Sequence, residues 1–360
     1  MRNIHETILY VNLNTLGENL KHLKSKLHND TKVIAVVKAF AYGLGDVSVA
    51  KHLEKIGVYA FWVADFEEGV QLRKGGIISP IIVANPGSKS LESILTYQLE
   101  PVIYNQYLLD LYAKNKRDIS IHLKFNTGMN RYGFNQNEID EVISKLNHNS
   151  NLKVKSICSH LSVSNEPLND VFSKNQMKNF NSIRLKLEKK LNYIIPFHIM
   201  NSNGVIRFNT SSNEWVRLGI ALYGGIEHKE LKQIFSLKSV ISQLRNIKAG
   251  ESVGYQNSFK AYKAMKIAII PVGYADGLNR KLGNQKSHIF INDRACEIIG
   301  EISMDSFAAD VTGLNVVEGQ EVVIFSPKYS VSKLADNLST IPYEIMATLN
   351  RRIKRVYLKE

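Results

Sequence analysis

The feature that most constrains the fold is a regular alternation of apolar runs and amphipathic segments from the N-terminus to about residue 220. Residues 33–37, 60–64 and 80–84 are short apolar runs, which are typical of strands buried on both faces of a sheet. Between such runs lie segments with apolar residues at three- and four-residue steps, which are typical of helices. This alternation predicts parallel β-α-β units.

Two α/β architectures share this pattern, an open doubly wound sheet and a closed (β/α)₈ barrel. Polar residues recur at the predicted strand ends, and the chain lacks the G-x-G-x-x-G loop of dinucleotide-binding sheets. We therefore predict an α/β fold that begins with a (β/α)₈ TIM-like barrel.

The pattern changes near residue 230, where short strands are separated by glycine and polar turns. The predicted strands are residues 237–247, 265–270, 287–291, 295–299 and 321–325, and the predicted helices are residues 331–338 and 343–349. We expect residues 1–230 to form the barrel and residues 231–360 to form a mostly β C-terminal domain. Residues 8–11 alternate in polarity, so whether residues 1–11 join the β domain is left open.

Composition excludes several classes of protein. The formal charge is +13, but the lysines are dispersed and no nucleic-acid-binding motif occurs, so we expect no nucleic-acid partner. No apolar run reaches the ~18–20 residues of a membrane helix, and the N-terminus lacks the pattern of a secretory signal. Cys158 and Cys296 have no C-x-x-C spacing, which suggests neither a metal site nor a disulfide framework. We expect a cytoplasmic protein with no membrane partner.

Lys38 directly follows the apolar run 33–37. The carboxyl ends of buried parallel strands are where barrels place their chemistry, and burial or a nearby cation lowers an amine's pKa so that it can attack a carbonyl. A strand-end lysine that extends into water is the ordinary alternative. Further polar residues and turns at predicted strand ends are Lys124, Arg131, His160, Ser202, Arg217 and Gly219.

The segment KAFAYGLG, which begins at Lys38, resembles the KANAYGHG segment of the alanine racemases. Other segments that resemble this family are ESVGY, PVGYADG, ISMD, IPYEI and RIKRVY. These motifs are distributed over both predicted domains and nearly the whole chain. The resemblance implies an isomerase that depends on pyridoxal 5′-phosphate (PLP).

The resemblance also implies a role for each matching residue. Lys38 resembles the lysine that holds PLP as a Schiff base, and the other expected cofactor-binding residues are Tyr42, His160, Ser202, Arg217, Gly219 and Ile220. Arg131 and Met304 are expected to contact the substrate, and Lys124 resembles a lysine that is often carbamylated. Tyr255, at the end of ESVGY, resembles a second catalytic residue.

The implied activity is the interconversion of L- and D-alanine, which supplies D-alanine for peptidoglycan. Racemisation of this kind uses a base on each face of Cα, here Lys38 on the D face and Tyr255 on the L face. In the family, Tyr255 and Met304 would come from the partner subunit, so a homodimer is expected.

The chain departs from the family pattern at several positions. Phe40, Leu44, Asn126 and Asn130 stand where asparagine, histidine, aspartate and glycine are usual, and Arg351 stands where many members have a tyrosine. The last departure leaves open a racemase of another amino acid, such as serine or lysine. A non-catalytic PLP-binding protein is a further alternative, against which the second domain argues. A PLP-dependent decarboxylase is disfavoured because its glycine-triplet loop is absent.

Overall fold

The computed structural model describes residues 4–211 and 214–359. The chain divides into two compact units, which we describe separately. The barrel unit comprises Leu20–Ala41 and Asp46–Ala221, and the β unit comprises the described residues of Met1–Asn19, Tyr42–Gly45 and Leu222–Glu360. The long first helix, α1 (Leu13–Lys24), runs from one unit into the other.

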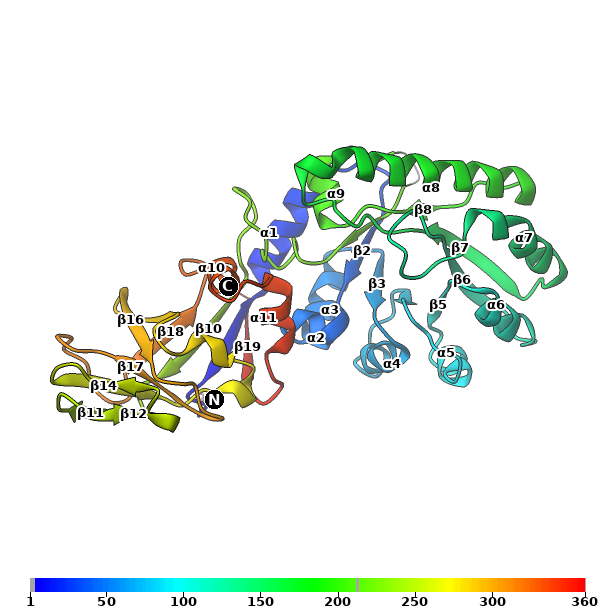
Figure 1. Ribbon diagram of the computed structural model, residues 1–360. Coiled ribbons are helices and arrows are strands. Elements are labelled where there is room, and N and C mark those ends of the chain that lie inside the picture. The colour runs from blue at the N-terminus through cyan, green and yellow to red at the C-terminus, as the bar shows by residue number, and fades with distance from the viewer. Residues whose placement is uncertain (1–3, 212–213, 360) are drawn as a thin grey trace. The chain divides into compact units, whose positions relative to one another are not determined.

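The barrel unit is built on eight parallel strands, counted among the described residues, in the order β8-β7-β6-β5-β4-β3-β2-β9 (Figure 1). They are β2 (Val33–Val36), β3 (Ala60–Val63), β4 (Ile81–Val83), β5 (Glu100–Ile103), β6 (Ile119–Lys124), β7 (Leu152–Cys158), β8 (Phe197–His198) and β9 (Val216–Leu218). The two ends of this series also meet, since Trp215 N donates to Phe197 O at 2.8 Å and Arg217 N donates to Met200 O at 3.0 Å. The strands therefore close into a ring, and the predicted (β/α)₈ barrel is confirmed.

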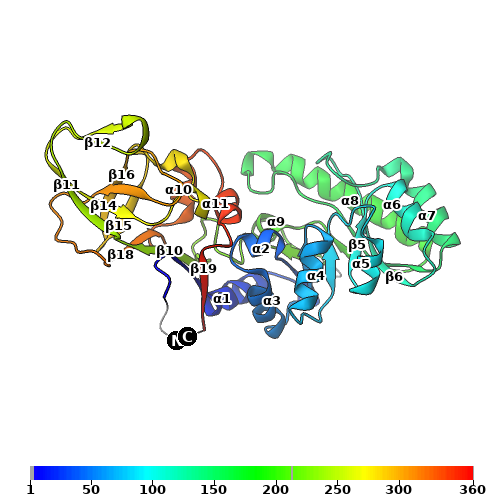
Figure 2. The same ribbon diagram turned by 90° about the horizontal axis from the view of Figure 1, so that it is seen from below.

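Helices follow the strands and lie on the outside of the barrel (Figure 2). They are α3 (Asp46–Lys55), α4 (Phe66–Lys74), α5 (Leu91–Thr96), α6 (Gln106–Ala113), α7 (Ile139–His148), α8 (Asp170–Leu191) and α9 (Ser202–Arg207), with short 3₁₀ turns η1 (Gln136–Glu138) and η2 (Pro167–Asn169). The segment α2 (Lys38–Tyr42), which directly follows β2, has left-handed backbone angles and is described below. The N-termini of α4, α6 and α9 are capped by a short polar side chain. Asp65, Asn105 and Asn201 each accept a backbone N–H of the first turn that follows, at 2.9–3.0 Å.

The β unit contains a nine-stranded sheet, again counted among the described residues, in the order β11-β14-β17-β16-β15-β18-β10-β1-β19. The strands are β1 (Ile8–Asn12), β10 (Phe235–Val240), β11 (Gln243–Ile247), β14 (Met265–Ile270), β15 (His288–Ile291), β16 (Arg294–Ile299), β17 (Phe307–Asp310), β18 (Glu321–Phe325) and β19 (Lys354–Leu358). The unit also has the pair β12 (Ser252–Val253) and β13 (Phe259–Lys260), helices α10 (Val331–Asn337) and α11 (Pro342–Thr348), and 3₁₀ turns η3 (Tyr255–Asn257), η4 (Tyr274–Asp276) and η5 (Arg280–Leu282).

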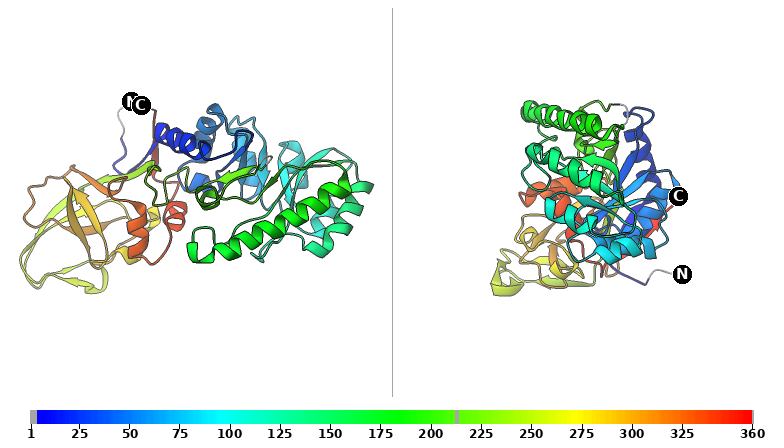
Figure 3. Two further views of the ribbon diagram at one scale, coloured as in Figure 1. Left: turned by 90° about the horizontal axis from the view of Figure 1, so that it is seen from above. Right: turned by 90° about the vertical axis from the view of Figure 1, so that its right-hand side faces the viewer.

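The first and last strands of the chain lie side by side in this sheet. β1 pairs in parallel with β19 and antiparallel with β10, and Figure 3 shows the blue and red strands together. The mostly β C-terminal domain is therefore confirmed, and its sheet also includes β1 from the beginning of the chain.

One predicted strand is wrong in detail. Residues 237–247, expected as a single strand, form β10 and β11, which pair with different neighbours. Between β10 and β11 the chain passes from one neighbouring strand to another. Two bonds mark this change, since Ile241 N donates to Gln320 O and Ser242 N donates to Ile269 O, both at 2.9 Å. The short helices α5 and α6 were not predicted.

Across the residues that the structure describes, no helix combines the length and apolar character needed to cross a bilayer.

Candidate active site

Lys38 is followed by a backbone turn of left-handed conformation. The φ angles of Ala39, Phe40, Ala41 and Tyr42 are 51°, 58°, 51° and 55°, so this segment is a left-handed helical turn. Such a conformation costs L-residues about 1–2 kcal/mol each and persists only where the surroundings hold it. Glu68 on α4 holds its first residue, since one carboxylate oxygen accepts Ala39 N at 2.6 Å and the other accepts Ala64 N at 2.7 Å. Lys38 is therefore fixed at the carboxyl end of β2.

The amine of Lys38 is poised to lose its proton. Desolvation lowers its pKa below the ordinary lysine value, and the positive charges of Arg131 and Arg217 lower it further against an opposing contribution from Glu68. The residue is nevertheless exposed in the single chain, so the amine remains open to a ligand. These are the properties expected of a lysine nucleophile.

Lys124, at the end of β6, is buried, and burial lowers its pKa to about 8 while Arg217, Arg131 and Lys38 act in the same direction. Its Nζ lies 5.7 Å from the centre of the Tyr132 ring. Lys124, Arg131 and His160 line one small cavity, so three of the predicted residues come together here.

The loop that carries Arg131 explains two departures from the family pattern. The side-chain oxygen of Asn126 accepts Gly128 N at 3.1 Å and Asn130 N at 3.0 Å, a task that an aspartate oxygen could also perform. Asn130 has φ 55°, a left-handed conformation that asparagine tolerates better than most residues. The loop can therefore keep its form without the usual aspartate and glycine.

Arg217 on β9 is buried and surrounded by acceptors. Its guanidinium donates to Ser159 O at 2.6 Å, His198 O at 3.0 Å and His160 Nδ1 at 3.1 Å, and it also contacts His198 Nδ1. Burial lowers the pKa of His160 well below its usual range, and Arg217 is the largest electrostatic contributor. His160 is therefore a neutral acceptor that orients the arginine.

Ser202, Gly219 and Ile220 form a second group of predicted residues. Ser202 is buried as the first residue of α9, and its hydroxyl oxygen accepts Gly219 N at 3.0 Å and Ala221 N at 3.4 Å. Ile220 between them is buried. The two backbone N–H groups therefore hold the Ser202 hydroxyl in place at the start of α9, and the hydroxyl hydrogen is left to donate to an acceptor such as a phosphate oxygen.

The remaining predicted residues belong to the β unit. Tyr42 is buried, with its ring centre 5.1 Å from that of Tyr223 and 5.8 Å from that of Tyr343, and burial raises the pKa of its hydroxyl. Tyr255 in η3 and Met304 are large side chains left 70% and 53% exposed in the single chain. Both are therefore available to a second copy of the chain.

Arg352 was not singled out from the sequence. It donates to Asp276 at 2.8 Å and to Asp305 at 2.7 Å, and so joins the PVGYADG and ISMD segments. Backbone bonds reinforce this junction, since Ala275 N donates to Met304 O at 3.0 Å. The one signal in the sequence for this junction is that each of the two motifs contains an aspartate.

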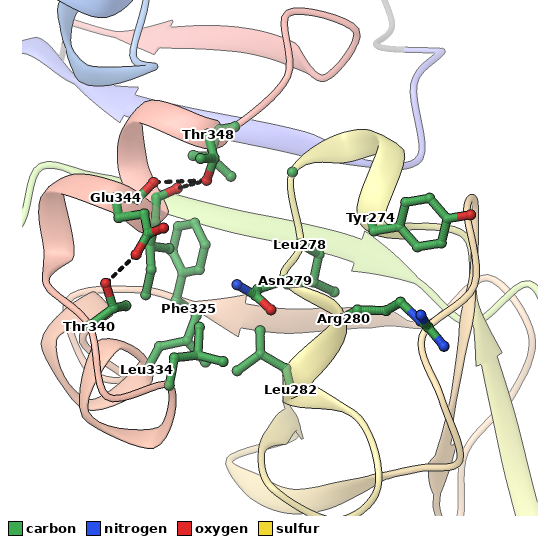
Figure 4. A pocket seen from close by; sticks show the side chains of 14 residues that line it. Tyr274, Leu278, Asn279, Arg280, Leu282, Phe325, Leu334, Thr340, Glu344 and Thr348 are labelled. Atoms are coloured by element: carbon green, nitrogen blue, oxygen red, sulfur yellow. Dashed lines mark hydrogen bonds between the residues drawn. The ribbon is translucent and has the colours of Figure 1, made fainter. Parts of the chain in front are cut away.

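The β unit also has a cavity of about 350 Å³ bordered by Tyr274 (Figure 4). Its floor is apolar, formed by Leu278, Leu282, Phe325 and Leu334. Glu344 and Thr340 hydrogen-bond to each other at its edge. None of the residues predicted for catalysis or cofactor binding lines it.

Comparison with known proteins gives a consistent result. The family model described as the N-terminal domain of alanine racemase matches residues 11–227, and that of the C-terminal domain matches residues 234–357. A curated alanine racemase of Clostridium novyi is 34% identical, with 97% of this chain and 94% of that protein covered.

Solved structures agree. The alanine racemase of Clostridium difficile 630 has a TM-score of 0.91 and 27% identity, covering 99% of this chain and 97% of that one. The alanine racemase of Bartonella henselae with covalently bound pyridoxal phosphate has a TM-score of 0.88 and 28% identity, covering 98% of this chain and 100% of that one.

Proposed function

The chain belongs to the alanine racemase family, and we propose that it interconverts L- and D-alanine with PLP as cofactor, using Lys38 and Tyr255 as its two bases. The observation that carries the proposal is the group formed at the strand ends of the barrel unit. There the Lys38 amine has a lowered pKa, Arg217 is buried, and the Ser202 hydroxyl is held by Gly219 N.

The residues present fit PLP. The hydroxyl of Ser202, held by the N–H groups beside it, can donate to a phosphate oxygen, and the family resemblance adds Tyr42, Gly219 and Ile220 to this subsite. Arg217 offers N–H donors for the pyridine nitrogen, and His160 accompanies it. Lys38 supplies the amine for covalent attachment. When bound, the cofactor withdraws electrons from Cα of the amino acid and makes its proton acidic.

The protein's own groups then move that proton. Lys38 Nζ removes or returns it on the D face, and Tyr255 Oη, from the partner subunit of a homodimer, does so on the L face. Arg131 binds the substrate carboxylate, and Met304 of the same partner contacts the substrate. Because Arg217 can only donate, it favours an unprotonated pyridine nitrogen and so restrains side reactions.

Lys124 has a second proposed role. Its pKa of about 8 leaves part of the amine neutral near physiological pH, and a neutral amine can react with carbon dioxide. A carbamate on Lys124 would carry a negative charge in the cavity that it shares with Arg131. That charge would orient the arginine towards the substrate.

We further propose that the enzyme acts in the cytoplasm and supplies D-alanine for peptidoglycan. Arg351, in place of the usual tyrosine, supports a second candidate, a racemase whose preferred amino acid is serine or lysine.

One experiment tests the activity. The purified chain is incubated with PLP and separate L-amino acids in deuterium oxide, and exchange at Cα is followed together with chirality. We expect fast exchange with alanine and formation of the D-isomer. Exchange only with serine or lysine would favour the second candidate, and bound PLP without any exchange would refute racemase activity. A Lys38→Ala variant is the control, which should neither attach PLP nor racemise alanine.

A further inference from the structure

Five side chains on five strands form a continuous hydrogen-bonded series through the barrel. Glu100 on β5 meets His122 Nε2 at 2.9 Å, and His122 Nδ1 meets Ser156 Oγ at 2.7 Å. Ser156 Oγ meets His198 Nε2 at 2.9 Å, and His198 Nδ1 meets the Arg217 guanidinium. We call this series the Glu100–Arg217 relay. His122, Ser156 and His198 are fully buried, so water does not compete for these contacts.

The arginine end favours one direction for every bond in the relay. A guanidinium can only donate, so it favours the form of His198 in which Nδ1 accepts and Nε2 carries the ring proton. Burial and the charge of Arg217 lower the pKa of His198 well below its usual range, which keeps the ring neutral. His198 Nε2–H then donates to Ser156 Oγ, whose own hydrogen is left for His122 Nδ1.

The carboxylate end favours the same direction. A carboxylate can only accept, so it selects the form of His122 that carries its proton on Nε2. His122 Nδ1 is then an acceptor for the Ser156 hydroxyl, and that hydroxyl presents its lone pairs to His198. Both ends therefore specify one arrangement in which every atom of the relay has a partner of the right kind, and such bonds reinforce one another.

We propose that Glu100 is a positioning residue for Arg217, acting through the tautomers of His122 and His198. The proposal rests on the proposed function in one respect, that Arg217 faces the cofactor. Glu100 touches no residue predicted to bind PLP or substrate, and its side chain is 17% exposed. Without the Glu100 carboxylate, His122 can carry its proton on Nδ1, and the Ser156 hydroxyl can then reverse its direction. His198 can in turn present an N–H to the Arg217 guanidinium, which itself can only donate.

The test reads the tautomers directly. In the full-length chain labelled with ¹⁵N-histidine, with and without PLP, ring nitrogen shifts distinguish a protonated nitrogen from an acceptor. We expect His198 and His122 to carry the proton on Nε2 in the native chain. In Glu100→Leu, we expect His198 to lose this single form, the visible absorption of bound PLP to shift, and kcat to fall about tenfold with little change in KM.

Three variants separate positioning from general damage. Glu100→Gln keeps an acceptor oxygen for His122 and should restore the native His198 resonances and most of kcat. Ser156→Ala interrupts the relay in the middle, and should change His198 as Glu100→Leu does even if the latter folds poorly. Asp118→Ala removes an exposed carboxylate just before β6 that is paired only at 3.9 Å with Lys153, and should change nothing.

A native His198 protonated at Nδ1 would overturn the proposal. So would His198 resonances that are the same in native chain, Glu100→Leu and Ser156→Ala. Failure of the proposed function looks different, because the native chain would then not racemise alanine whatever its histidine tautomers.

Discussion

An amine buried among cations is more reactive than its exposed counterpart, because it holds its proton less tightly. Lys124 illustrates this, with a pKa lowered to about 8 from 10.5. About half of its amine is neutral at pH 8 and about a tenth at pH 7, whereas an ordinary lysine has under about a hundredth neutral at pH 8.

We therefore predict that Lys124 takes up carbon dioxide with a pH dependence centred near 8. With ¹³C-bicarbonate, a carbamate resonance should grow from pH 7 to pH 9 and disappear in Lys124→Ala. A native chain that shows no such resonance at pH 9 would contradict the prediction.

Glu214 gives a second prediction, on stability. Burial raises its pKa to about 7 from 4.5, despite a hydrogen bond from Ser211 N and the charge of Arg217. Between pH 4.5 and pH 7 the folded chain binds more protons at Glu214 than the unfolded chain does. The contribution of this group to the free energy of unfolding is therefore complete below pH 4.5 and is lost as the pH rises through 7. Glu214→Gln should be more stable than the native chain at pH 8, by up to about 3 kcal/mol, and equal to it near pH 4.

Urea unfolding at both pH values measures this difference. The exposed carboxyl of Glu227 provides the control, since Glu227→Gln should show no such change. Equal stability of Glu214→Gln and native chain at pH 8 would be the contrary result.

How far the sequence predicted the site depends on what kind of contact holds each residue. Lys38, Arg131 and Tyr255 lie in recognisable motifs, so their identity could be proposed from the sequence. Glu68 and His198 could not, because their roles exist only once neighbouring strands meet. The partners of the buried Arg217 guanidinium are backbone carbonyls and neutral imidazoles, which no spacing rule identifies from the sequence.

Among the elements, the left-handed turn after β2 and the glycine that follows it are tightly constrained by packing. Gly43 has φ +80°, and a Cβ there would lie 2.0 Å from the Met346 carbonyl oxygen. The strand before this turn was predictable from its apolar run. The hand of the turn was not, since alanine, phenylalanine and tyrosine all disfavour it.

We predict that Gly43→Ala destabilises the β unit by roughly 3 kcal/mol or more, through strain and the clash together. Gly319 is a matched control, because its φ is +82° and a Cβ there meets nothing within 4 Å. Gly319→Ala should cost only about 1 kcal/mol. Equal shifts of the urea midpoint for the two variants would show that the packing against Met346 is unimportant.

For the whole molecule, the main prediction concerns sharing of the active site between two copies. If Lys38 of one subunit works with Tyr255 of the other, Lys38→Ala and Tyr255→Phe chains should complement each other. Random mixing makes half of the dimers hybrid, and each hybrid has one intact site, so about a quarter of native activity should return.

Each variant alone should remain far below this level. The measurement is the racemase activity of the two variants after they have been mixed and refolded together. A mixture no more active than its components would indicate that both bases come from one chain.

The pairing of β1 with β19 has a consequence for biogenesis. Residues 8–12 are synthesised long before their parallel partner, residues 354–358. At typical synthesis rates the interval is on the order of tens of seconds, during which one edge of β1 has no partner strand. The barrel strands, by contrast, are all made before residue 222, so the nascent chain can complete its first unit before β1, the first strand of the second unit, can pair with β19.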